Sequence, residues 1–66
     1  MGEWRKLRDG ELVLTDTVMA IVYQPRKNGD FAIYSGSRYQ WSCMTLARAK
    51  RDAEEILNEL IEIGAA

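Results

Sequence analysis

A chain of 66 residues that is 47% hydrophobic, with a formal charge of -1, is too apolar for a disordered tail and too balanced for a polybasic arm. It has no histidine and one cysteine, Cys43, which excludes zinc sites, histidine-dependent triads and an internal disulfide. No run approaches the roughly 20 apolar residues that span a bilayer, and Met1–Arg8 lacks the apolar core of a secretory signal. We therefore expect one cytoplasmic domain over residues 1–66 that needs no metal or cofactor.

The first half of the chain has the pattern of β-strands. Trp4–Arg8 and Glu11–Thr15 flank the dipeptide Asp9-Gly10, which tolerates the positive φ angles of a tight hairpin turn. Val18–Gln24 (VMAIVYQ) is the strongest strand, because it is rich in β-branched and aromatic residues and ends at Pro25, which has no backbone N–H to donate.

Two further segments follow the polar connection Arg26–Asp30. Phe31–Ser35 resumes the apolar pattern and should pair antiparallel with the preceding strand. After a second turn at Gly36-Ser37, Arg38–Ser42 forms either a last short strand or an extended approach to a helix.

The hydrophobic period becomes helical from Thr45 onward, which predicts a helix over about residues 46–63. Thr45 should cap its first turn, Met44 should pack onto Ala49, and Gly64 suits a left-handed end. One apolar stripe faces the sheet and consists of Leu46, Ala49, Ala53, Ile56, Leu57 and Leu60. The prediction is an α+β fold: an antiparallel meander of three to four strands, over about residues 3–42, with one C-terminal helix packed on one face.

A single helix covers only one face of such a sheet, yet both alternating sets of side chains in the two central strands are apolar. Either Trp4 or Trp41 folds over the second face, or that face stays exposed and pairs with a second copy or with a protein partner. We expect the exposed face to carry Tyr23 and Tyr34. Tyrosine, arginine and tryptophan dominate binding hot spots, so the predicted partner-binding residues are Tyr23, Arg26, Tyr34, Arg38, Tyr39 and Trp41, with the two arginines at the edge of the face.

Other surfaces and functions compete with this prediction. The acidic end of the helix, with Glu55, Glu59 and Glu62, is the next candidate surface. A small nucleic-acid-binding protein is the main alternative function, because basic residues lie near aromatic ones as in a stacking platform. The balance of 10 acidic against 9 basic residues, with a pI near 5.3, disfavours it. Catalysis is disfavoured because the turn aspartates and the serines have no adjacent base.

The chain contains a run through Trp4, Gly10, Val22-Tyr23, Gly29 and Phe31, closed by TLARAKRDAEEIL over Thr45–Leu57. In this pattern it resembles small meander-plus-helix proteins carried by phages and other mobile elements. Some proteins of this kind inhibit host defence, including anti-CRISPR proteins that occupy a binding surface of a nucleoprotein effector. The resemblance implies a stoichiometric inhibitor that is not an enzyme. The chain differs from strongly acidic DNA mimics in being nearly neutral, which favours blocking of a protein surface.

Overall fold

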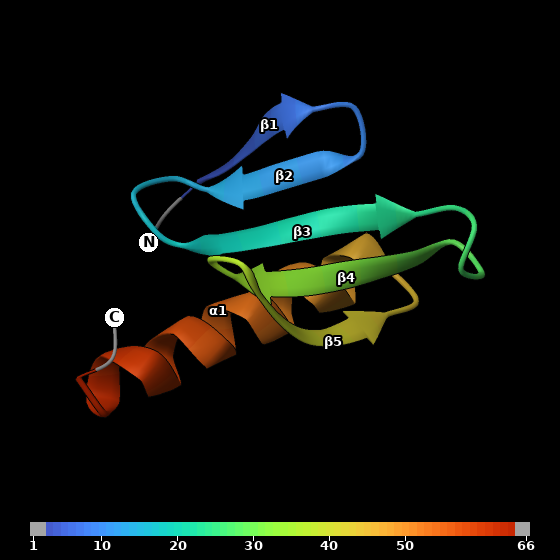
Figure 1. Ribbon diagram of the computed structural model, residues 1–66. Helices are drawn as coiled ribbons and strands as arrows, with labels where there is room; N and C mark the ends of the chain where they lie inside the picture. The colour runs from blue at the N-terminus through green and yellow to red at the C-terminus, as the bar shows by residue number, and fades with distance from the viewer. Residues whose placement is uncertain (1–2, 65–66) are drawn as a thin grey trace.

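Five strands follow one another in the computed structural model, which describes residues 3–64, and each strand pairs antiparallel with the next (Figure 1). Their bounds are β1 Trp4–Arg8, β2 Glu11–Leu14, β3 Met19–Gln24, β4 Asp30–Ser35 and β5 Arg38–Cys43. The predicted α+β meander with one C-terminal helix is confirmed. The strand count is one higher than predicted, because the segment after Gly36-Ser37 is a full strand rather than an extended approach.

Residues with positive φ angles make the turns that allow this order. Gly10 has a φ of 79° between β1 and β2. Asn28 and Gly29, with φ of 61° and 70°, close the turn between β3 and β4, where Gln24 pairs with Asp30. Glycine has no Cβ to oppose such angles, and asparagine adopts them more readily than most residues, so this Asn-Gly pair favours the turn that joins β3 to β4.

The helix α1 spans Leu46–Glu62 and begins where the sequence predicts. The Thr45 hydroxyl caps it by accepting a hydrogen bond from the Arg48 backbone N–H at 3.2 Å, and Gly64 follows its end with a φ of 75°. The predicted contact of Met44 with Ala49 is wrong, since Met44 is 85% exposed and Ala49 is buried. No helix within residues 3–64 is long and apolar enough to cross a membrane.

The core lies between α1 and one face of the sheet. Its fully buried large side chains come from β2, β3 and β4, while α1 contributes small alanines that let the helix lie close to the strands. The buried cluster contains Leu14, Met19, Ile21, Ile33, Cys43, Ala49, Ala53 and Ile56. The helix packs against β3, β4 and β5, and the β1–β2 hairpin extends beyond it (Figure 1).

Candidate functional site

The strand register assigns each side chain to the face that carries α1, here called the helix face, or to the opposite one, the open face. Ile21 pairs with Ile33 on the helix face, and Tyr23 pairs with Phe31 on that same face. The residues that alternate with them lie on the open face and include Val13, Ala20, Val22, Ala32, Tyr34 and Tyr39. The open face is therefore apolar and aromatic along its centre.

Both tryptophans belong to the helix face. The indole N–H of Trp4 donates to Glu54 Oε2 at 3.1 Å, and that of Trp41 donates to Asp52 Oδ2 at 3.2 Å. Since Glu54 and Asp52 are both on α1, neither indole can fold over the opposite side of the sheet. Of the two outcomes that the sequence left open, the structure therefore favours an open face that no tryptophan covers.

Asp52 joins the end of β5 to the helix. Besides the Trp41 indole, its Oδ2 accepts a hydrogen bond from the Cys43 thiol at 3.3 Å and lies 3.5 Å from Arg48 Nε. The thiol hydrogen bond is the main cause that lowers the pKa of Asp52. Burial, aided by the same carboxylate, raises the pKa of Cys43, which favours the protonated thiol.

The predicted partner-binding residues separate into two groups. Tyr34 and Tyr39 are paired on the open face, with ring centroids 5.8 Å apart, and Arg26 lines the same hollow as these two rings. The expectation that Tyr23 shares a face with Tyr34 is wrong. Direct pairing of Tyr23 with Phe31, and of Ala20 with Tyr34, places the two tyrosines on opposite sides of the sheet.

The other two predicted residues also leave the open face. Arg38 pairs with Ser35, which pairs with Met19 of the core, so Arg38 belongs to the helix face, as does Trp41. Arg26 and Arg38 follow β3 and β4 respectively, and because these strands run antiparallel the two arginines lie at opposite ends of the sheet. They cannot form one basic edge.

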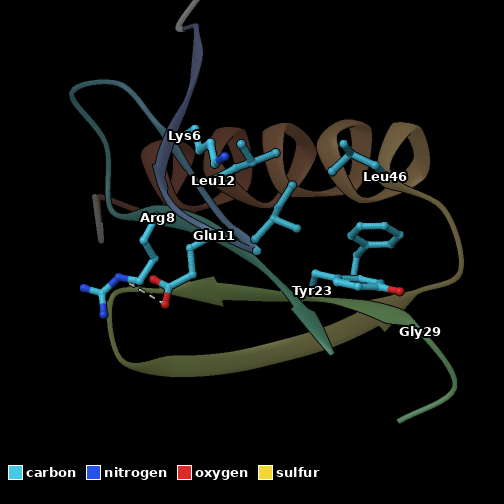
Figure 2. A pocket seen from close by; sticks show the side chains of 10 residues that line it. Lys6, Arg8, Glu11, Leu12, Tyr23, Gly29 and Leu46 are labelled. Atoms are coloured by element: carbon cyan, nitrogen blue, oxygen red, sulfur yellow. Dashed lines mark ion pairs between the residues drawn. The ribbon is translucent and has the colours of Figure 1, made fainter. Parts of the chain in front are cut away.

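A groove with a volume of about 430 Å³ opens on the helix face, between the first turn of α1 and the β1–β2 hairpin (Figure 2). Its wall includes the Tyr23 and Phe31 rings, whose centroids are 5.0 Å apart at an angle of 34°. The side chains that line it are mostly apolar, with charged ones at one end; its lining residues are Lys6, Arg8, Gly10, Glu11, Leu12, Ile21, Tyr23, Gly29, Phe31 and Leu46.

The charges beside this groove are paired within the chain. Lys6 Nζ lies 3.0 Å from Asp9 Oδ1, and Arg8 Nε lies 3.5 Å from Glu11 Oε2. Each pair joins residues three apart across the β1–β2 turn, so the hairpin itself brings them together. The groove consequently offers an apolar surface whose rim has little net charge.

Only Tyr23 among the groove residues was predicted from the sequence as a partner-binding residue. Leu12, Phe31 and Leu46 read as ordinary core positions, because alternation and helical spacing predict which face they occupy but not whether a neighbour covers them. The one sequence signal that could have revealed the groove is the width of the predicted sheet compared with that of a single helix. Five strands at about 4.8 Å spacing span about 19 Å, which is wider than one helix of about 10 Å diameter.

Comparison with protein-family models, with curated proteins and with solved structures finds no match. Within residues 3–64, no three Cys, Asp or Glu side chains gather where they could hold a metal ion. Glu55, Glu59 and Glu62 at the acidic helix end are all exposed, and in this part of the chain they form no ion pair. The groove on the helix face and the hollow lined by Arg26, Tyr34 and Tyr39 on the open face are the candidate binding sites.

Proposed function

We propose that the protein is a non-catalytic protein-binding module, and that its groove on the helix face takes an apolar segment of a partner protein. The observation that carries this proposal is the groove itself: an apolar floor and an aromatic wall beside a rim whose charges are already paired. A site of this kind favours burial of apolar side chains, and its described residues offer no unpaired cation to a charged ligand.

The energetics are sufficient for an anchor residue. Complete burial of one Leu or Phe side chain contributes about 1.5–3 kcal/mol, and a volume of about 430 Å³ is large enough to hold apolar side chains of this size. The tilted Tyr23–Phe31 pair presents a broad aromatic surface whose rings already pack on each other. Less conformational freedom is then lost when a partner binds.

The shape of the site favours a helical segment of the partner. Because α1 packs on β3, β4 and β5, the turn end of the β1–β2 hairpin stays uncovered beside it (Figure 1). Two strands at a spacing of about 4.8 Å present a strip of about 10 Å, which matches the diameter of one helix. A partner helix would lie next to α1 and complete the layer above the sheet.

Binding of this type inhibits a partner by occupying its surface in a complex of one module with one target molecule. The resemblance to small mobile-element proteins that block host defence supports this mode of action, and a nucleoprotein effector is one partner that fits it. Such a mechanism needs no active site in this chain, only a complex that dissociates slowly.

Site-specific photo-cross-linking tests the proposal inside the cell. A photoreactive phenylalanine analogue would replace Tyr23, at the groove, or Tyr39, on the open face, in the host that carries the gene. The two tyrosines are matched controls, because Tyr23 is 43% exposed and Tyr39 is 52% exposed, yet they lie on opposite faces. We expect a single protein adduct from position 23 and none of that mass from position 39.

Affinity measurements with the cross-linked protein, once purified, make the test quantitative. Tyr23→Ala should cost about 2 kcal/mol of binding free energy, roughly thirtyfold in Kd, whereas Tyr39→Ala should leave Kd within about twofold. Equal losses from both variants, or adducts from position 39 alone, would refute the groove as the binding site. An adduct whose mass is twice that of the chain would instead identify a second copy as the occupant.

A further inference from the structure

A second hollow, with a volume of about 660 Å³, lies on the open face beside the turn between β3 and β4. In contrast to the groove, its lining is mainly polar and aromatic, and it consists of Gln24, Arg26, Lys27, Asn28, Asp30, Tyr34, Tyr39 and Ser42. It shares no residue with the groove and opens on the other side of the sheet.

The cations of this hollow are free to meet a ligand. Within residues 3–64, the ion pairs of the chain involve Lys6, Arg8 and Arg48, and neither Arg26 nor Lys27 takes part in one. Among the described residues, Asp30 is the only acidic one in the lining, so the hollow they form has a formal charge of +1. Two unpaired cations on one short turn are suited to an anionic group.

The overall charge of the chain hides this local excess of positive charge. The helix α1 contains three Lys or Arg and five Asp or Glu residues, a formal charge of -2, which leaves +1 for the rest of the chain. The helix lies behind the sheet as seen from the open face. A pI near 5.3 therefore does not describe the surface around Arg26 and Lys27.

Two tyrosines stand next to these cations. Tyr39 is 52% exposed, and Tyr34, directly opposite on β4, meets its ring edge to face at an angle of 69°. The Tyr39 hydroxyl is also hydrogen-bonded to the Ser42 hydroxyl at 2.9 Å. Two contacts thus hold the Tyr39 ring in place while much of its surface stays open to solvent.

We infer that this hollow binds single-stranded nucleic acid, with a base stacked on Tyr39 and the adjoining phosphates at Arg26 and Lys27. Base stacking on an aromatic ring next to phosphate-binding cations is how proteins hold single strands. An acidic protein segment would use the two cations but leave the fixed, exposed ring without a specific role. The geometry therefore favours the nucleotide. This surface is separate from the groove, so it adds to the proposed function and does not depend on it.

Fluorescence anisotropy with a labelled oligothymidylate of about eight nucleotides tests the inference, and an oligoglutamate peptide of equal length serves as the competing ligand. We expect the oligothymidylate to bind and the peptide not to. Two phosphate contacts predict a salt slope of about -1.4, or about a sevenfold loss of affinity from 50 to 200 mM salt. Tyr39→Ala should weaken binding by about five- to 150-fold, the equivalent of about 1–3 kcal/mol for one stacked base, whereas Tyr39→Phe should retain most of it.

Matched variants separate stacking and phosphate contacts from general charge effects. Arg26→Gln combined with Lys27→Gln should abolish the salt slope, while Arg51→Gln, which removes an exposed cation from α1, should leave it unchanged. Tyr23→Ala, on the helix face, should bind the oligothymidylate normally. No binding at all, equal binding of the oligoglutamate, or an equal loss from Tyr23→Ala and Tyr39→Ala would overturn the inference.

Discussion

Threonine substitution at two adjacent positions of β3 tests whether the two faces of the sheet differ as described. Ile21 is 1% exposed and points into the core beneath α1, whereas Val22 is only half-buried and points to the open face. The two residues share one strand and one backbone environment. They therefore differ mainly in what covers their side chains.

The expected free energies follow from these environments. Ile21→Thr combines the loss of a buried methylene, about 0.5–1.5 kcal/mol, with burial of an unpartnered hydroxyl, about 1–3 kcal/mol, for a total of about 1.5–4.5 kcal/mol. Val22→Thr nearly preserves shape, and its hydroxyl can reach water, so it should cost less than about 0.5 kcal/mol. A chain of this length is stable by only about 3–10 kcal/mol, so the first change is severe.

Thermal unfolding followed by circular dichroism measures both effects. At about 4–8 °C per kcal/mol for a small domain, Ile21→Thr should lower Tm by about 6–36 °C and Val22→Thr by less than about 4 °C. Similar losses from the two variants would refute the assignment of an uncovered face. A wild-type Tm that rises with protein concentration would then show that a second copy covers it, as in a homodimer formed through the open face.

Two further variants test the contacts that hold α1 to the rest of the chain. Asp52→Asn should lower Tm most at neutral pH, because the lowered pKa of this carboxyl means that its charged form stabilises the fold. The difference in Tm between Asp52→Asn and wild type should begin to shrink as the pH falls below 3.8, the ordinary pKa, and vanish below the folded-state pKa. A difference in Tm that does not change with pH would contradict the roles of Cys43 and Trp41 as donors to this carboxylate. Thr45→Ala removes the helix cap and should lower the free energy of unfolding by about 1 kcal/mol, or Tm by about 4–8 °C, while Thr45→Ser should keep the wild-type Tm. The same Tm for all three proteins would show that the cap contributes nothing to stability.

Local features of the sequence determine most of the fold. The positive φ angles of Gly10 and Gly29 place two of the turns, the β-branched run places β3, and the Thr45 cap with its apolar stripe places α1. These features depend only on residues that are close together in the chain, so they can be predicted from the sequence. The sequence leaves the segment after Gly36 open between a strand and an extended approach, because only half of RYQWSC is apolar or aromatic and its conformation depends on pairing with β4.

Only the tertiary structure decides which side chains meet. Tyr23 and Tyr34 have similar places in their strands, but the register of β3 against β4 sends them to opposite faces, since a shift of one residue exchanges the faces. Trp4 reaches Glu54, 50 residues away, because the helix returns across the sheet. The same return path covers Trp4 and Leu14 at one end of the β1–β2 hairpin and leaves its turn end uncovered, which creates the groove. Composition and periodicity do not show where a helix stops covering a sheet.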